Sequence, residues 1–203
     1  MAGKRNTKTE AKIKAAFTTL VQSKGFDAMT VSDIARTAGI NRGTFYMHYL
    51  DKFDLRRQLI DDTAANLTDI LMDNADDGAR TTSPTGRSVC DAFQTESISA
   101  ALRYVRDDYA FFNAISRSGN DMQLYDKLKK VLKQLIVTQA QRCNADPQAT
   151  YNGIPADYAM EILVSAVASI IWLWIRRGCK ETPEQISRII EINKTTAPID
   201  VLW

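Results

Sequence analysis

The chain has 203 residues, of which 45% are hydrophobic and 25% are charged. This length and composition suit a globular protein with a substantial core, and they exclude wholesale disorder and fibrous repeats. The lone histidine and three widely spaced cysteines match no zinc-ligand spacing, and we find no Ser/His/Asp arrangement and no glycine-rich phosphate loop. We therefore expect no metal, no cofactor and no enzymatic activity.

The net charge of +2 is unevenly distributed along the chain. Residues 1–60 hold eleven Lys or Arg and five Asp or Glu, a balance of +6, whereas the remainder has a balance of −4. This asymmetry predicts a polyanionic partner at the N-terminal end of the protein. The alternative is an ordinary solvated charged surface.

Three features bear on the compartment. The odd, sparse cysteine count fits a reducing cytosol, and residues 3–6 are polar, with no apolar signal core. Residues 162–175 lack charge, but this stretch is shorter than the roughly twenty residues of a membrane span and contains Ser165 and Ser169. We expect a cytoplasmic protein, with no membrane contact, in which this stretch is a buried or dimer-forming helix.

The first part of the chain predicts three helices. An i, i+3, i+4, i+7 apolar stripe indicates an amphipathic helix over 9–24. Two short helices follow over 31–38 and 42–49, separated by Gly39, which tolerates the left-handed conformation of a helix end. Asn41 is a favourable N-cap for the second of them. The pattern is that of helix, tight glycine turn, helix.

The rest of the chain is also predicted to be helical, which gives an all-α fold of about nine helices. Asp, Gly, Thr, Ser and Pro dominate residues 76–87, which we predict to be a flexible loop, and 145–153 is a second loop. We expect no strand and no internal repeat. The remaining predicted helices cover 51–74, 90–107, 108–116, 121–142, 155–177 and 182–194, with Pro155 in the first turn of the fifth of these and a capping box of Thr182 and Gln185 opening the last.

The helix over 42–49 has the chemistry of a DNA-reading helix. Arg42 can donate two hydrogen bonds to a guanine, and Thr44 can reach a base edge or a thymine methyl group. Gly43 lets the backbone approach closely, whereas Phe45 is expected to face the domain core. Helix-glycine-helix turns also occur in proteins that do not bind DNA.

Phosphate contacts are predicted around this helix. A mobile arm with Lys4, Arg5 and Lys8 could follow the DNA backbone or minor groove. The alternative for Thr30 is helix capping alone, and for the tyrosines it is simple packing. The predicted phosphate-binding residues are Thr30, Tyr46, His48, Tyr49 and Lys52.

The run TVSDIARTAGINRGTFYMHYLDKFDL at residues 30–55 resembles the signature of the TetR family of transcriptional regulators. The similarity extends over about residues 9–60 and rests on many spaced positions; Phe53 departs from it, because the family often has Glu there. The resemblance implies a DNA-binding domain over 1–50 and a helical effector-binding and dimerisation domain over 51–203. It also implies a homodimeric repressor that a small molecule releases from DNA. A coactivator or partner-binding protein without such an effector is the alternative.

A weaker resemblance concerns the C-terminal part. Residues 102–112 and 154–158 resemble a TetR subgroup that includes regulators of dihydroxyacetone utilisation. Aromatic residues at helical spacing in this region suggest an effector pocket, although such residues more often form a core. The candidate pocket residues are Tyr104, Phe111, Phe112, Tyr125 and Trp172.

The last two helices, 155–177 and 182–194, are predicted to form the dimer. Two helices from each subunit would make a four-helix interface. The alternative is that residues 159–175 form only a buried core helix. Such a dimer would place two reading helices about 34–36 Å apart on a palindromic operator. The predicted interface residues are Ala159, Ile162, Leu163, Ser165, Ala166, Val167, Ala168, Ser169, Ile171 and Leu173.

Overall fold

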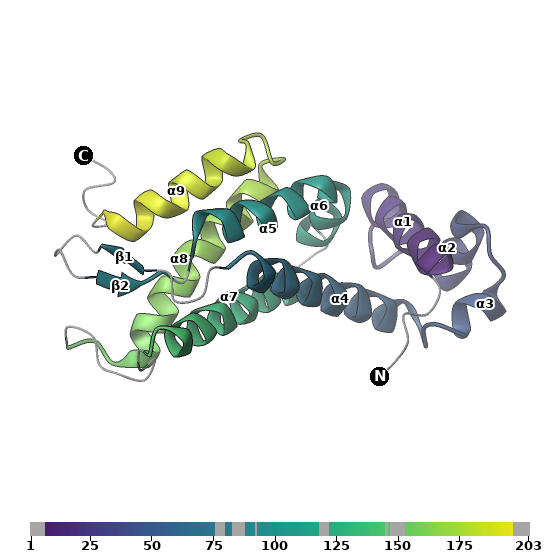
Figure 1. Cartoon of the computed structure of the whole chain (residues 1–203). Coiled ribbons are helices and arrows are strands. Elements are labelled where there is room, and N and C mark those ends of the chain that lie inside the picture. The colour runs from purple at the N-terminus through teal and green to yellow at the C-terminus, as the bar shows by residue number, and fades with distance from the viewer. Residues whose placement is uncertain are drawn as a thin grey trace.

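The computed structural model describes residues 7–75, 80–82, 88–91, 93–117, 122–144, 146 and 153–196. Within these residues the chain forms nine helices and one small antiparallel hairpin (Figure 1). The all-helical prediction is confirmed. The elements are α1 (Thr7–Lys24), α2 (Val31–Ala38), α3 (Arg42–Tyr46), α4 (Lys52–Asp73), β1 (Arg80–Thr82), β2 (Ser88–Cys90), α5 (Thr95–Asp107), α6 (Tyr109–Arg117), α7 (Gln123–Arg142), α8 (Ala156–Arg176) and α9 (Pro183–Thr195).

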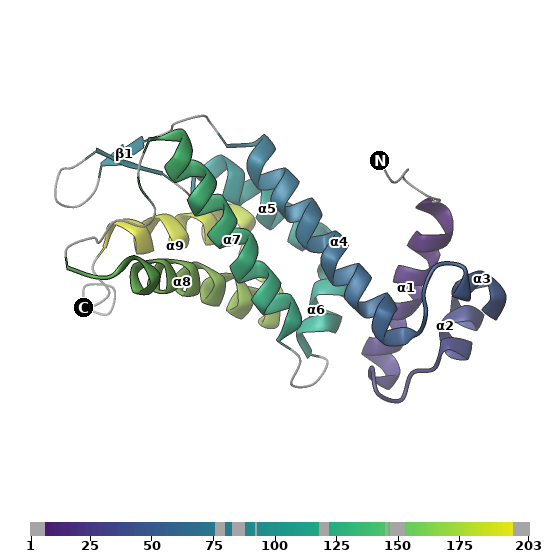
Figure 2. The same ribbon diagram turned by 90° about the horizontal axis from the view of Figure 1, so that it is seen from below.

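Helices α1, α2 and α3 form a small group at one end of the molecule, which we call the head (Figure 1). Helices α4 to α9 form the body. Helix α4 starts beside the head and runs into the body, where it packs against α5 and α7. Figure 2 shows α4 and α7 crossing the body together, with α8 and α9 beyond them. The chain therefore passes from the head to the centre of the body along one helix.

Local signals in the sequence explain the helix boundaries of the head. The Thr30 side chain accepts from the Asp33 backbone N–H, and the Asp33 side chain accepts from the Thr30 backbone N–H, so a capping box opens α2. Gly39 has a φ of +66°, the left-handed geometry that glycine adopts without a Cβ penalty. Asn41 caps α3 and Asp51 caps α4 through their side-chain oxygens. The core beneath is apolar and includes the fully buried Ile13, Phe17, Ile34, Phe45 and Leu55.

The body is held by apolar contacts between helices that are distant in sequence. Helix α5 packs against α4 and α9, and α8 packs against α6, α7 and α9. Trp174 is buried in α8, and its indole N–H donates to the backbone oxygen of Glu181 at 3.0 Å. Thr182 and Gln185 form the capping box predicted for the last helix.

Four sequence expectations about elements are wrong. The expectation of no strand is wrong, because β1 pairs with β2, with Thr81 opposite Val89. β-Branched residues such as these favour strands. The helix predicted from residue 90 starts at Thr95. Helix α3 ends at Tyr46, three residues early, and Pro155 is an N-cap residue rather than a first-turn residue. The predicted arm residues Lys4 and Arg5 and most of the two predicted loops lie outside the described residues.

Two cysteines among the described residues differ in their state. Cys143 is disulfide-bonded. Cys179 is a free thiol, and burial raises its pKa to about 11. A thiol with this pKa is protonated at neutral pH and is therefore a poor nucleophile.

Helix α8 covers Ala156–Arg176, close to the predicted 155–177. Its 21 residues make it the one helix, among those described, that is long and apolar enough to cross a membrane by length and composition. A third of its most apolar window is buried inside the protein. Since core helices of soluble proteins pass the same test, one such helix is weak evidence for a membrane span.

Candidate nucleic-acid interface and apolar cavity

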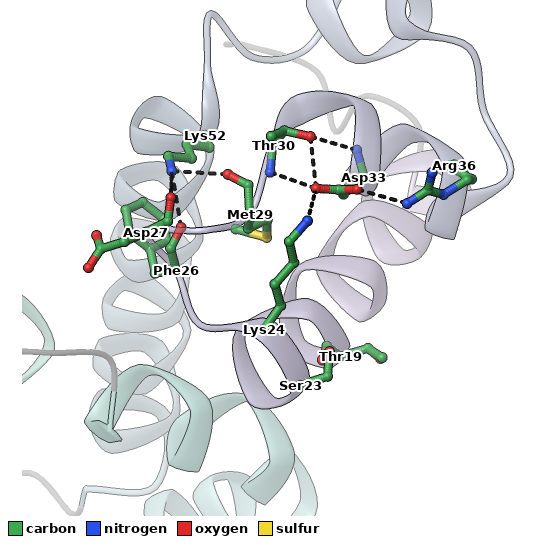
Figure 3. A network of polar contacts seen from close by, with 10 residues as sticks. All are labelled: Thr19, Ser23, Lys24, Phe26, Asp27, Met29, Thr30, Asp33, Arg36 and Lys52. Carbon is green, nitrogen blue, oxygen red and sulfur yellow. Dashed lines mark hydrogen bonds and ion pairs between the residues drawn. The ribbon is translucent and has the colours of Figure 1, made fainter.

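A charged network around Asp33 fixes the start of α2 (Figure 3). The Asp33 carboxylate accepts from Lys24 Nζ at 2.6 Å, from the Thr30 hydroxyl at 2.8 Å and from the Thr30 backbone N–H at 3.0 Å. Arg36 donates to its other oxygen at 2.7 Å. The Lys24 and Thr30 hydrogen bonds hold the pKa of Asp33 well below its usual value. The ionised carboxylate therefore ties the end of α1 to the start of α2.

Lys52 holds the other side of the head together (Figure 3). Its ammonium donates to the backbone oxygens of Phe26, Asp27 and Met29 at 3.1, 2.8 and 3.0 Å. An ammonium has three N–H donors, so the loop between α1 and α2 occupies all of them. This contact fastens the first residue of α4 to the head. Phosphate binding by Lys52 stays a prediction, and it would have to share these donors.

Helix α3 presents its first turn to solvent. Arg42 and Gly43 are exposed and Thr44 is half-buried, while Phe45 is fully buried as expected. The Asn41 side-chain oxygen accepts from the Thr44 backbone N–H at 2.7 Å and from its hydroxyl at 3.0 Å. These bonds fix the first turn of α3 before any ligand is present.

Two further contacts set the geometry of this turn. Arg42 donates to the Tyr46 hydroxyl at 3.2 Å, one helical turn away, so its guanidinium is held over the exposed side of α3. A Cβ at Gly43 would lie 3.2 Å from the Asn41 cap oxygen, which is a tight contact. Glycine at this position therefore protects the cap and leaves the backbone accessible.

The other predicted phosphate-binding residues occupy mixed environments. Tyr49 is buried against Phe45, and burial, helped by the negative charge of Glu10, raises its pKa to about 12. The His48 ring nitrogen lies 3.5 Å from a carboxylate oxygen of Glu10. Thr30 and Tyr46 are both exposed. The contacts of Tyr49 are those of a packing residue. Phosphate contacts by Thr30, Tyr46, His48 and Tyr49 stay predictions.

Contacts between α1 and α6 join the head to the body. Lys14 forms an ion pair with Asp108, and its ammonium lies 4.4 Å from the centre of the Phe111 ring. Gln22 donates to the backbone oxygen of Ala110 at 3.0 Å. Phe111, a predicted pocket residue, thus lies at the contact between head and body. The sequence did not indicate this contact, because it joins residues about ninety positions apart.

An apolar cavity lies in the body between α4, α5, α6, α7 and α8. All of its lining residues are apolar except Lys127, which pairs with Asp61 at 2.6 Å. Its volume is about 30 Å³, which is room for roughly one water molecule. A larger ligand would therefore have to displace lining side chains.

The five predicted pocket aromatics separate into two groups. Phe112 and Trp172 line the cavity. The Tyr104 hydroxyl accepts from the Asn66 amide at 3.1 Å, and the Tyr125 hydroxyl lies 3.2 Å from that of Ser169. These two tyrosines and Phe111 are not among the residues lining the cavity.

An apolar face remains exposed along α8 and α9. Ile162 is 61% exposed and Leu173 is 50% exposed, although both lie on an apolar helix. Other predicted interface residues point inward: Val167, Ala168 and Ile171 are buried within the subunit. The exposed large apolar side chains of the two helices are Tyr158, Ile162, Leu173, Ile189 and Ile192.

Comparison with known proteins identifies both parts of the chain. Residues 13–59 match the family model of bacterial regulatory proteins of the tetR family, and residues 94–193 match the model of a transcriptional regulator C-terminal region. The HTH-type transcriptional regulator YxbF of Bacillus subtilis is 22% identical over 189 residues. That alignment covers 88% of this chain and 43% of YxbF, so the chain spans less than half the length of the curated relatives it matches.

Solved structures share the fold over most of the chain. The dihydroxyacetone kinase operon activator DhaS has a TM-score of 0.59 at 20% identity, covering 92% of this chain and 96% of DhaS. FadR from Bacillus subtilis, solved with stearoyl-CoA, has a TM-score of 0.60 at 15% identity, covering 91% and 97%. At these identities the similarity shows the fold alone, and the predicted subgroup stays a prediction. The two matched family models carry the assignment: the chain belongs to the TetR family of bacterial helix-turn-helix transcriptional regulators, which are not enzymes.

Proposed function

We propose that this regulator binds a palindromic operator as a homodimer in the cytoplasm and represses transcription until a small molecule releases it. The exposed first turn of α3 carries the proposal. Arg42 is held over the solvent face, Gly43 leaves the backbone accessible, and Asn41 fixes the turn in advance. Such preorganised donors suit the edge of a guanine in the major groove.

The exposed apolar face of α8 and α9 supports the homodimer. Ile162 and Leu173 are eleven residues apart, about three turns, and therefore lie on one side of α8. Ile189 and Ile192 form a matching pair on α9. Exposed large apolar side chains aligned along a helix favour an interface, and a second copy offers the same self-complementary face. The resulting four-helix contact would set two copies of α3 about 34–36 Å apart.

The cavity and α4 support release by an effector. Ala64, Leu67 and Leu71 of α4 line the cavity. The first residue of the same helix, Lys52, donates hydrogen bonds to the α1–α2 loop of the head. A ligand that displaces these side chains would shift α4 and change the separation of the two heads. The nearly complete absence of polar lining favours an apolar effector. Stearoyl-CoA, bound by the similar B. subtilis FadR, is the first compound to test.

Two observations favour a second function, a coactivator that responds to no small molecule. The cavity holds only about 30 Å³, and the similar protein DhaS is an operon activator. Transcription of a reporter gene controlled by the regulator's operator, measured with and without the regulator, distinguishes repression from activation.

The proposal is tested by selecting sequences from random DNA with the full-length protein and footprinting the product. We expect two inverted half-sites with centres 10–10.5 base pairs apart, or a multiple of this, as a two-fold symmetric dimer requires. Light scattering should show two chains per particle. Stearoyl-CoA should weaken operator binding if the effector has an acyl chain. Selection of an asymmetric single site by a monomer would contradict the proposal.

A further inference from the structure

Two large apolar side chains on the head are the most exposed of their kind among the described residues. Met47 is 84% exposed and Leu50 is 79% exposed. Both follow α3 directly, next to the turn that carries Arg42 and Thr44. Neither is used by the core, and neither belongs to the α8 and α9 face. Their position in the chain puts them beside the surface proposed to meet DNA.

The helical geometry points Met47 toward the DNA side of α3. Met47 keeps helical backbone angles, and its N–H donates to the Gly43 oxygen at 3.1 Å, so it continues the helix by one residue. With about 100° between successive residues, Met47 lies roughly 200° around the axis from the buried Phe45, and Gly43 lies roughly 160° from it. Both positions therefore face directly away from the head core.

Met47 follows Gly43 by one helical turn. Long side chains in a helix lean toward its N-terminus and cover the turn that precedes them. The position one turn before Met47 is Gly43, which has no side chain to occupy that space. No side chain at Gly43 therefore separates Met47 from the exposed surface between Arg42 and Thr44, where a base edge would lie.

The chemistry of this surface selects one kind of group on DNA. The only apolar group that base pairs present in the major groove is the C5-methyl of thymine. Methionine is flexible and polarizable, and it packs well against irregular apolar surfaces. We propose that Met47 reads a thymine methyl group beside the base contacted by Arg42. This inference rests on the proposed function, because it assumes that α3 enters the major groove.

Uracil substitution tests the contact, because uracil differs from thymine only by the methyl group. In one half-site of the selected operator, each thymine is replaced singly by uracil, and dissociation constants are measured for wild type, Met47→Ala and Leu50→Ala by fluorescence anisotropy. Wild type should lose about fourfold in affinity at one thymine, the value of one buried methyl group. Met47→Ala should bind the thymine operator more weakly and show no further loss with uracil at that position.

Leu50→Ala is the matched control, since Leu50 is equally exposed but lies beyond the helix. It should keep the fourfold uracil effect of wild type. The inference is overturned if the half-site has no thymine, if Met47→Ala keeps the uracil effect, or if Leu50→Ala abolishes it as well. Failure of wild type to select any DNA sequence would refute the proposed function itself, and this inference with it.

Discussion

The head and the body both have apolar cores, but they differ in how their functional surfaces are built. Hydrogen bonds and ion pairs fix the helix ends of the head. They are made by Asp33, by Lys52 to the α1–α2 loop, and by the caps Asn41 and Asp51. The body depends on apolar packing between distant helices, encloses a small apolar cavity and leaves an apolar face exposed. Directional hydrogen bonds fix the reading helix in one geometry, whereas an apolar body can repack around a ligand and associate with a copy. This difference suits a rigid head that reads DNA (the reader) joined to a body that can adjust to a ligand (the sensor).

Breaking the exposed apolar face should have a large effect on function. Ile162→Asp combined with Leu173→Asp would bury two charges in the proposed dimer interface. We expect monomers by light scattering and a loss of operator affinity of about a hundredfold or more, because the two heads no longer bind together. Met122→Asp, an exposed apolar position on another part of the body, is the control. A double variant that remains dimeric would locate the interface elsewhere.

Truncating a buried aromatic side chain tests whether DNA binding depends on the packing of the core of the head. Phe45 is fully buried under α3, so Phe45→Ala should cost about 3–5 kcal/mol of stability and abolish operator binding. Leu102→Ala, in the cavity lining of the body, should cost about 2–5 kcal/mol yet leave the reading surface unchanged. Thermal melts together with DNA binding separate the two results. Equal loss of DNA binding by both variants at a temperature where each is folded would contradict the division into reader and sensor.

The capping box of the head should contribute a smaller amount. Thr30→Ala removes the side chain that accepts from the Asp33 N–H and should lower stability by about 1 kcal/mol in denaturant titrations. Thr19 is the comparison, since its exposed hydroxyl only donates to the Ala15 oxygen within α1. Thr19→Ala should leave stability nearly unchanged or raise it slightly, because alanine has the better helix propensity. An equal loss of stability in both variants would show that the Thr30 cap does not stabilise the head.

The smallest effect is a pH dependence set by Asp33. Its pKa is lowered in the folded protein, so its ionised form stabilises the fold above the usual pKa of 3.8, and this contribution is lost as the pH falls below that value. Wild type should therefore melt at a higher temperature than Asp33→Asn at pH 6, and the gap should narrow steadily below pH 4. A gap that does not change with pH would mean that the charge of Asp33 is not what stabilises the head.

The same contrast explains what could be predicted from the sequence. The caps at Thr30, Asn41 and Thr182 join atoms within three residues, so local patterns reveal them. The bonds from Lys52 to the α1–α2 loop and from Lys14 to Asp108 join residues 23–26 and 94 positions apart, which no local pattern encodes. Aromatic spacing likewise could not separate Phe112 and Trp172, which line the cavity, from Phe111, which faces α1.

Arg42 provides the most direct test that the first turn of α3 reads the operator. Affinities of wild type, Arg42→Ala and the distant control Arg103→Ala are measured for the selected operator and for unrelated DNA of equal length and salt. Arg42→Ala should lose about 1–3 kcal/mol on the operator, should lose much less on unrelated DNA, and should remain dimeric, while Arg103→Ala behaves as wild type. Equal losses on both DNAs, or no loss on the operator, would contradict a base-reading role for this turn.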